Sequence, residues 1–446
     1  MIHSNIYFIA CFYIISTITL VGCSRDNFLG EDYDVPLLGK RIPVMRLAKN
    51  LHEDPSLSKT RMVFPRSYTN TSWSQTGGNA SKTLGHIRAG NKIIKIWSKS
   101  VAKGGNQERA LLSQPLIIKD IILVLDSEAN LRAIRVNNGD TIWKRELRPE
   151  GEDNVVYSGG IVADKKNVYV ATGFGEIISF AINNGVENWR ARIPGSVRGA
   201  PTIANGRLFV LTLENNTFAL LTSNGSRIWE HQGITEVARL LGGGAAPAVW
   251  GSTVLIPYSS GQLFALRVET GHMIWFENLS SLRVTDAISR LADIYASPVI
   301  DHNIAFAISH AGCMAGIDMR SGRRIWERAI GSTAMPWVVG DYIFVVNLSG
   351  ELLAMTKTDG RIRWVKKLPR FVNMEDQKDP IRYVGPVMAG DNLLIGSSDG
   401  FLYLISQYTG QQLDKITIGD PIYVSPIVAG GKIYILDNKG QLHVFC

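Results

Sequence analysis

Side chains that could carry out catalysis are sparse and scattered in this sequence. None of its eight histidines is spaced as a metal-binding pair, and its four cysteines show no metal-site spacing. The chain contains no His-Glu-x-x-His, no Gly-x-x-x-x-Gly-Lys-Ser/Thr and no Gly-x-Ser-x-Gly motif, since the stretch 258–261 lacks the leading glycine. The triple glycine at 242–244 could cradle an anion, but without a following helix we interpret it as a loop. We therefore expect no enzymatic activity, no metal site and no cofactor.

One cysteine stands in a pattern typical of covalent lipid attachment. The chain is almost wholly apolar from Ile6 to Val21, and no Asp, Glu, Lys or Arg precedes Arg25. This run ends in Leu-Val-Gly-Cys at 20–23, which resembles a bacterial lipobox, in which the cysteine is acylated and the preceding segment removed. We expect residues 1–22 to be a lipoprotein signal peptide and Cys23 to be the lipidated residue. An uncleaved membrane anchor is the alternative, because the first five residues carry no Lys or Arg.

The formal net charge of +8 is spread along the chain rather than clustered. The 47 basic and 39 acidic residues form no run of five or six like charges, so we expect a solvated surface and no nucleic-acid binding. Cys313 and Cys446 are the cysteines left outside the N-terminal segment. They could pair in an oxidising compartment, but we interpret them as small buried strand residues.

Two sequence anchors recur together and indicate a repeated structural unit. The first anchor is a proline before an apolar stretch, and it occurs at positions 115, 201, 247, 298, 336, 386 and 426, with Gly160 once in the same place. The second anchor is Gly-x-x-x-Trp, whose last residue follows the first anchor by 28 or 29 residues. Its tryptophans are Trp143, Trp189, Trp229, Trp275, Trp326 and Trp364, and Asp414 takes their place in a seventh copy.

Each copy is expected to fold as four antiparallel strands, because three turn signals divide it into short apolar or alternating stretches. The copies repeat about every 44 residues, which is the length of a propeller blade. After Pro426 only three strands fit, and residues 91–98, which contain Trp97, can supply the fourth. We therefore predict an all-β fold, an eight-bladed β-propeller over 91–446 that an N-terminal strand closes, with the tryptophans packed between blades.

The Gly-x-x-x-Trp repeat resembles the pyrroloquinoline-quinone (PQQ) repeat superfamily across 91–446. Within it, the lipobox, the short linker and the absence of an added domain resemble the BamB family of outer-membrane β-barrel assembly factors. The resemblance implies a non-enzymatic scaffold lipoprotein on the periplasmic face of the outer membrane, and Ser24 after the cysteine favours that membrane by analogy with lipoprotein sorting. It also implies binding to the periplasmic domains of BamA, through it to the other assembly subunits, and as a further candidate to unfolded outer-membrane proteins.

Two stretches are similar to loops of that family. Residues 289–293 resemble an Arg-Leu-x-Asp stretch, and residues 238–244 resemble an apolar-Arg-Gly loop. The resemblance implies that both loops bind the partner. The residues so implied are Arg239, Leu240, Leu241, Gly242, Arg290 and Asp293. This chain departs from the family pattern, since Tyr295 replaces a second acidic residue and the family arginine falls on Gly242. For Asp293 a turn or cap role is the alternative, and for Leu241 it is packing under a loop.

A second function class shares the same repeat. A PQQ-dependent quinoprotein dehydrogenase, or a quinone-binding propeller, is the alternative to a scaffold. Such enzymes commonly carry an adjacent cysteine pair and calcium-binding carboxylates, and this chain has no adjacent cysteines. Residues 23–90 contain no propeller anchor, so we expect an N-terminal tether there, partly extended.

Overall fold

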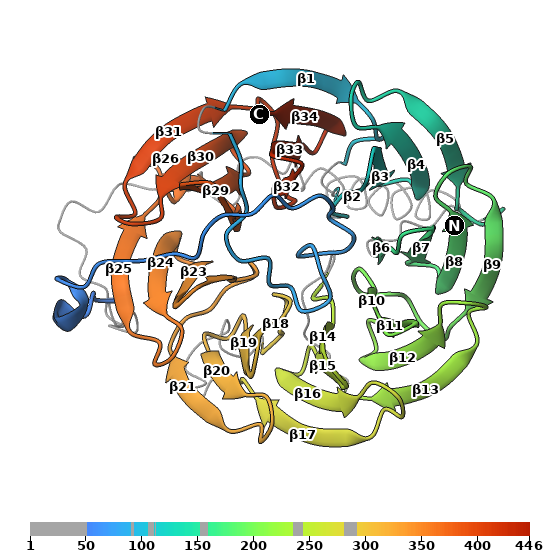
Figure 1. Ribbon diagram of the computed structural model, residues 1–446, viewed down its shortest axis with the longest axis horizontal. Coiled ribbons are helices and arrows are strands. Elements are labelled where there is room, and N and C mark those ends of the chain that lie inside the picture. The colour runs from blue at the N-terminus through green and yellow to red at the C-terminus, as the bar shows by residue number, and fades with distance from the viewer. Residues whose placement is uncertain are drawn as a thin grey trace, which may run out of the picture. The chain divides into compact units, whose positions relative to one another are not determined.

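The computed structural model of the chain describes residues 51–90, 93–105, 111, 113–151, 159–234, 244–280 and 292–446. Residues from Leu51 to the C-terminus form one compact unit. Figure 1 shows that the strands of this unit are arranged as a closed ring of small sheets around a central axis. Within the described residues, no helix has the length and apolar character needed to cross a bilayer.

The described strands form eight four-stranded antiparallel sheets and one separate hairpin, which confirms the predicted eight-bladed propeller. Blade 1 contains β2 (Leu116–Ile118), β3 (Ile121–Leu125), β4 (Asn130–Arg135) and β5 (Thr141–Glu146). Blade 2 contains β6 (Gly159–Ala163), β7 (Asn167–Thr172), β8 (Glu176–Ala181) and β9 (Glu187–Arg192). Blade 3 contains β10 (Thr202–Ala204), β11 (Arg207–Leu211), β12 (Asn216–Leu221) and β13 (Arg227–Gln232). Blade 4 contains β14 (Ala248–Trp250), β15 (Thr253–Pro257), β16 (Gln262–Arg267) and β17 (Met273–Asn278).

The second half of the ring repeats the same order. Blade 5 contains β18 (Val299–Asp301), β19 (Ile304–Ile308), β20 (Met314–Asp318) and β21 (Arg324–Arg328). Blade 6 contains β22 (Trp337–Val339), β23 (Tyr342–Val346), β24 (Glu351–Thr356) and β25 (Ile362–Lys367). Blade 7 contains β28 (Tyr383–Ala389), β29 (Asn392–Ser397), β30 (Phe401–Ser406) and β31 (Gln412–Thr417), and it follows the hairpin of β26 (Phe371–Asn373) and β27 (Lys378–Pro380). Blade 8 contains β32 (Ile427–Ala429), β33 (Lys432–Leu436), β34 (Gln441–Phe445) and β1 (Lys95–Ser100).

The ring closes between the two ends of the propeller sequence, as predicted. Strand β1 pairs antiparallel with β34, so that Trp97 lies opposite Val444 and Ser100 lies opposite Gln441. The C-terminal segment supplies the three inner strands of blade 8, and β1 supplies the outer one. This pairing covers the edge that β34 would otherwise expose.

The recurring tryptophans lock each blade to the next one. The indole of Trp143, for example, donates a hydrogen bond of 2.7 Å to the carbonyl of Ile182 in the following blade. Gly185 of that blade has a positive φ of 67°, and a Cβ there would lie 2.6 Å from the Trp143 ring. A glycine is therefore required both by the turn and by the approach of the tryptophan. The two halves of the sequence motif thus act in different blades, and the glycine of each copy accepts the tryptophan of the preceding copy.

The same interlock explains why the seventh copy has no tryptophan. Trp364 of blade 6 packs on Gly410 of blade 7, and the blade that follows Asp414 is blade 8. In blade 8, β34 and β1 come from opposite ends of the chain, so no turn joins the third strand to the fourth. Without that turn there is no glycine on which a tryptophan at 414 could pack. At the other side of blade 8, Trp97 packs on Gly139 of blade 1.

Residues before β1 are part of the same compact unit. Leu51–Thr60, here named the rim segment, contains the 3₁₀ helix η1 (Pro55–Leu57) and lies beside β25 at the outer edge of blade 6 (Figure 1). Residues 70–87, here named the axial segment, cross the centre of the ring. Sequence analysis began the propeller at residue 91, whereas the compact unit begins at Leu51.

The axial segment contacts the innermost strand, or the turn after it, in all eight blades. The contacts follow the ring in order from blade 8 round to blade 7. They join Asn70 to Val428, Trp73 to Ile117, Ser74 to Ala163, Gln75 to Ile203, Ala80 to Val249, Ser81 to Ile300, Gly85 to Trp337 and Ile87 to Gly390. Each contact is a hydrogen bond in which at least one of the two bonded groups belongs to the backbone. The segment therefore pairs with the inner edges that face the axis of the propeller.

Both cysteines in the described residues are free. Cys313 is buried, as expected, but Cys446 is exposed, so the expectation of two buried cysteines is wrong for the second one. Cys446 follows β34, and its backbone exchanges two hydrogen bonds with that of Ile94, while the residue itself stays exposed.

Candidate partner-binding face

The long loops of the propeller gather on one face. Because successive strands of a blade run in opposite directions, every connection from an outer strand to the next inner strand lies at the same end of the ring. Between β17 and β18 this connection spans residues 279–298, whereas only residues 302 and 303 join β18 to β19 at the opposite end. We name the end with the long connections the loop face. The β26–β27 hairpin is also part of it.

Most residues predicted to bind a partner lie outside the described residues. These are Arg239, Leu240, Leu241, Gly242 and Arg290, and the predicted lipidation site Cys23 is outside them too. The residues that flank these two stretches are described, and both stretches fall in outer-to-inner connections, 235–243 between β13 and β14 and 281–291 between β17 and β18. Asp293 is described, and its carboxylate is fully buried.

Asp293 forms an ion pair with Arg198, which precedes the first strand of blade 3. The Arg198 side chain is also buried, and it donates further hydrogen bonds to the carbonyls of Pro257 and Ile294, both at 3.3 Å. Breaking a buried pair of this kind leaves an uncompensated charge, so it is strongly destabilising. Asp293 therefore fixes the base of its loop in this structure, whether or not that loop contacts a partner.

The same arginine also fixes the base of the other predicted loop. A Cβ at Gly244 would lie 2.6 Å from the Arg198 side chain, so only glycine fits where this loop enters blade 4. The amide of Ala246 donates a hydrogen bond of 2.9 Å to the hydroxyl of Ser297 in the next connection. The residues that flank 235–243 and 281–291 are thus joined by the Ala246–Ser297 hydrogen bond, and Arg198 lies against both Gly244 and Asp293.

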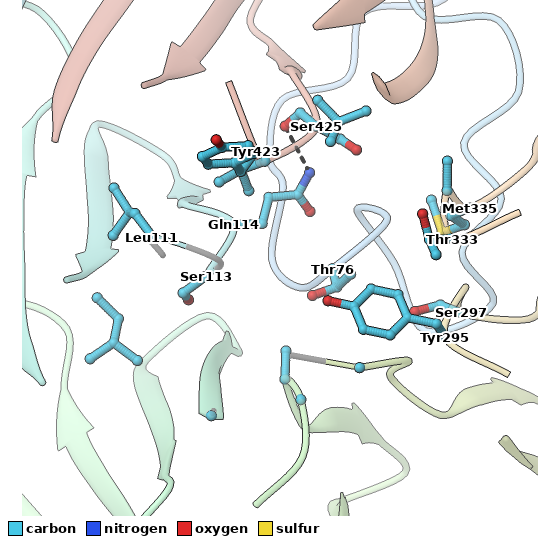
Figure 2. Close-up of a pocket in the computed structure, with 18 of the residues that line it drawn as sticks. Thr76, Leu111, Ser113, Gln114, Tyr295, Ser297, Thr333, Met335, Tyr423 and Ser425 are labelled. Atoms are coloured by element: carbon cyan, nitrogen blue, oxygen red, sulfur yellow. Dashed lines mark hydrogen bonds between the residues drawn. The ribbon is translucent and has the colours of Figure 1, made fainter. Parts of the chain in front are cut away.

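A pocket of about 570 Å³ lies on the propeller axis, among the bases of these connections. Trp73, Thr76 and Gly77 of the axial segment line one part of it. Residues just before the inner strands form its walls, and Figure 2 shows Ser113, Gln114, Tyr295, Ser297, Thr333, Met335, Tyr423 and Ser425 in this position.

The pocket walls combine aromatic rings with polar groups that lack partners. The Ser113 hydroxyl and the Nδ1 atom of His310 are buried and accept or donate no hydrogen bond within the described residues. Burial raises the pKa of Tyr295 and lowers the pKa of His310, although the nearby Asp293 opposes the latter shift. Such a wall can receive an apolar group with a polar tip.

The described residues do not bring together the side chains that a metal-dependent quinone site would use. They contain no group of three or more His, Cys, Asp or Glu side chains placed to hold a metal ion. Calcium requires six to eight oxygen ligands, mainly from carboxylates and carbonyls. Asp126, one of the lining residues, accepts hydrogen bonds from the amides of Lys103, Glu128 and Asn130.

Sequence analysis did not identify Arg198 or the axial segment. Arg198 stands three residues before the Pro201 anchor, at the place that Gly244 takes before Pro247. The signal that could have identified Arg198 was a charged residue next to a strand expected to be buried. For the axial segment, the signal was Trp73, an aromatic residue in a stretch otherwise typical of a tether.

Comparisons with known proteins agree with this architecture. The family model described as outer membrane protein assembly factor BamB matches residues 127–366, which is more than half of the chain. Outer membrane protein assembly factor BamB of Moranella endobia is 24% identical over 366 residues, covering 79% of this chain and 90% of that protein.

Two solved structures show the same fold. The crystal structure of BamB from Moraxella catarrhalis matches with a TM-score of 0.66 at 18% identity, covering 79% of this chain and 99% of that one. The quinohemoprotein alcohol dehydrogenase of Comamonas testosteroni matches with a TM-score of 0.64 at 13% identity, covering 85% and 81%. The propeller is therefore common to assembly factors and quinone enzymes, and the family model distinguishes them. The chain belongs to the BamB family of outer membrane protein assembly factors.

Proposed function

We propose that this chain is a non-enzymatic scaffold of the outer-membrane β-barrel assembly machinery, anchored through lipidated Cys23 to the periplasmic face of the outer membrane. Its partner is the periplasmic part of BamA, bound through the loop face, and through BamA it meets the other subunits. The observation that carries the proposal is the shared base of the loops at 235–243 and 281–291, which a buried ion pair holds together. A rigid base lets two loops bind one partner with little ordering cost.

Within this proposal, the predicted residues have two kinds of role. Arg239, Leu240, Leu241, Gly242 and Arg290 would contact the partner directly. Asp293 would act indirectly, because its carboxylate is buried against Arg198 and positions the loop. Substitution of Asp293 should therefore lower stability and binding together, whereas substitution of Arg239 should lower binding alone.

The test measures the affinity of the chain, purified from membranes, for the periplasmic domains of BamA. We expect Arg239→Glu to weaken binding by about tenfold or more, since interface arginines are often among the residues that dominate affinity. Lys165→Glu is the control, because residue 165 lies in the turn between β6 and β7 at the opposite end of the ring. Equal affinity of wild type, Arg239→Glu and Asp293→Asn would contradict the proposal.

The quinoprotein alternative makes a different prediction. A protein that binds PQQ with calcium is stabilised by mass action when both are added. We expect added PQQ and calcium to leave the melting temperature unchanged and to produce no bound-quinone absorbance after gel filtration. A rise in the melting temperature that saturates with PQQ would instead favour the quinone-binding function.

A further inference from the structure

The outer strands of the eight blades can be compared position by position, because their tryptophans share one register. In each blade we take two positions, the residue two places before the tryptophan and the residue one place after it, and compare this pair between blades. In six blades both are polar or charged. These pairs are Lys95 and Ser98, Thr141 and Lys144, Glu187 and Arg190, Arg227 and Glu230, Arg324 and Glu327, and, beside Asp414, Gln412 and Lys415.

Only blades 4 and 6 have apolar residues at both positions. Blade 6 has Ile362 and Val365 beside Trp364, and blade 4 has Met273 and Phe276 beside Trp275. Exposed outer edges normally carry charged residues, which discourage pairing with other chains. An apolar pair at this register therefore marks an edge that something covers.

In blade 6 the covering element is the chain's own rim segment. The amide of Asp54 donates a hydrogen bond of 2.8 Å to the carbonyl of Ile362, and the amide of Val365 donates one of 3.2 Å to the Glu53 carboxylate. As a result Ile362 is only 7% exposed.

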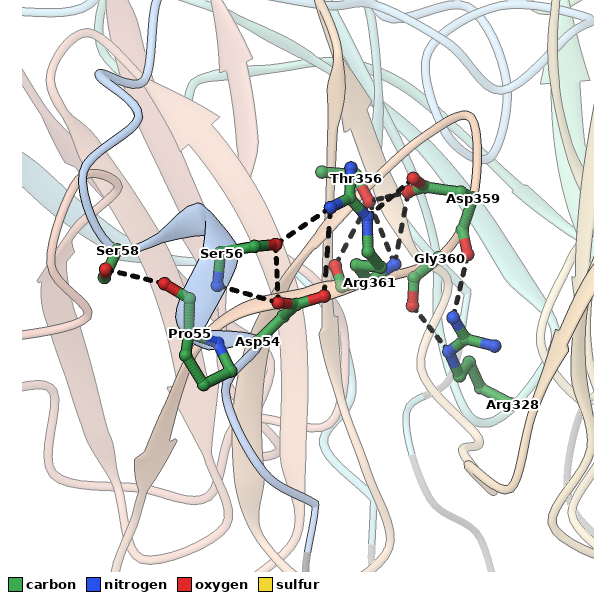
Figure 3. A network of polar contacts seen from close by, with 9 residues as sticks. All are labelled: Asp54, Pro55, Ser56, Ser58, Arg328, Thr356, Asp359, Gly360 and Arg361. Atoms are coloured by element: carbon green, nitrogen blue, oxygen red, sulfur yellow. Dashed lines mark hydrogen bonds and ion pairs between the residues drawn. The ribbon is translucent and has the colours of Figure 1, made fainter.

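Polar side chains along β25 complete this contact. The Arg361 side chain donates a hydrogen bond of 3.0 Å to the Ser56 hydroxyl and lies 3.8 Å from the Asp54 carboxylate (Figure 3). Arg363 reaches the carbonyls of Ser58 and Thr60, both at 3.3 Å. Blade 6 thus shows how an extended segment is held on an outer edge of this propeller.

The equivalent edge of blade 4 carries the same apolar pair without such a cover. Met273 is 56% exposed and Phe276 is 53% exposed, and Ile274 between them is also exposed. In the part of the chain that the structure describes, no backbone group hydrogen-bonds to the outer edge of β17 from Met273 to Phe276. The Phe276 ring stacks on Phe264 with their centroids 5.6 Å apart, so it is held in place at the surface.

We propose that the outer edge of β17 is a docking site for an extended segment of another polypeptide, in which large apolar side chains recur at alternate positions. The six residues of β17 span about 20 Å. This is too short for the 1,200–2,000 Å² that a stable interface between two folded copies would typically bury. A single added strand suits the edge, because its backbone would pair with β17 while its apolar side chains cover Met273 and Phe276.

Strands of unfolded outer-membrane barrels have this alternating pattern. The identity of the incoming polypeptide therefore rests on the proposed function, whereas the site itself rests on the comparison of blades. The apolar pair lies on the outer edge of blade 4, whereas the proposed BamA contacts lie in the connections of the loop face, so we expect the two activities to be lost independently.

The experiment uses the full chain, purified from membranes, with the photo-crosslinking amino acid p-benzoylphenylalanine at position 278. The probe is a urea-unfolded outer-membrane barrel protein diluted into the sample. The test variant is Met273→Arg with Phe276→Glu, which gives blade 4 the pair that blades 3 and 5 carry naturally. We expect the crosslinking yield to fall by about tenfold or more, since two large apolar contacts are lost.

A matched gain-of-binding control transfers the apolar pair to blade 3. With the crosslinker at position 232, Arg227→Met with Glu230→Phe should raise the yield above that of the unchanged blade 3. Circular dichroism and the melting temperature check that both variants remain folded.

Four outcomes would decide between explanations. Unchanged crosslinking in the Met273→Arg/Phe276→Glu variant would overturn the docking site, and so would crosslinks found only to a second copy of this chain. Loss of crosslinking with unchanged affinity for BamA would support the docking site. Strong crosslinking by a wild-type chain that does not bind BamA would contradict the proposed function and leave the docking site standing.

Discussion

Lys82 belongs to the axial segment, and its side-chain amino group is buried away from solvent. Its side chain is 1% exposed, and among the described residues its Nζ atom hydrogen-bonds only to the hydroxyl of Thr202, at 3.1 Å. That hydroxyl in turn donates to the carbonyl of Pro247. Since no described carboxylate forms an ion pair with it, burial lowers the pKa of Lys82 from 10.5 to about 7.

This shift predicts a pH-dependent stability. Between pH 7 and 10.5 the unfolded chain keeps a proton on Lys82 that the folded chain has released, so the free energy of unfolding rises with pH in this window. The slope from this group is at most about 1.4 kcal/mol per pH unit, and below pH 7 it vanishes. We expect Lys82→Met to remove this rise in chemical denaturation at pH 7, 8 and 9, while Lys165→Met retains it. Parallel curves for wild type and Lys82→Met would show that Lys82 is charged in the folded state.

At the scale of elements, sequence analysis predicted the blades, which repeat, and did not predict the rim and axial segments, each of which occurs once. The Gly-x-x-x-Trp copies fixed eight blades and the closing strand, because each copy repeats the same turn and the same interlock. The copy with Asp414 agrees with this logic, since blade 8 offers no turn glycine to its neighbour. A contact that every blade makes leaves the same residues at a regular spacing in the sequence, so it can be recognised there.

The rim and axial segments have no period and no strong local propensity. Their conformations depend on edges that exist only after the ring has formed, such as the inner strands that Trp73 and Ile87 join. The partner-binding loops differ again, because a resemblance suggested Asp293 as a contact, whereas the fold buries its carboxylate against Arg198. A single sequence does not show which of two charged residues, 95 positions apart, will meet. Long-range pairs of this kind were therefore the main part of the site that sequence analysis lacked.

At the scale of the whole molecule, the β1–β34 pairing decides whether the blades form a closed ring. Every other blade is made from one continuous stretch of chain, whereas blade 8 joins residues separated by almost the entire propeller. Opening this one pair would leave β1 and β34 with free edges, and it would also withdraw Trp97 from Gly139. We therefore expect closure to limit the stability of the ring.

A disulfide across the closure tests this expectation. Ser100 and Gln441 lie directly opposite one another, so Ser100→Cys with Gln441→Cys can form a bridge. In a Cys446→Ser background, it should stabilise the chain by up to about 5 kcal/mol, because it closes a very long loop in the unfolded state. Glu351→Cys with Lys367→Cys is the matched control, since it bridges the third and fourth strands within blade 6. Its loop is short, so we expect about 3 kcal/mol at most. Thermal melting with and without reductant measures both. If the bridge within blade 6 stabilises the chain as much as the closure bridge does, the closure is not the weak point of the ring, and opening begins elsewhere.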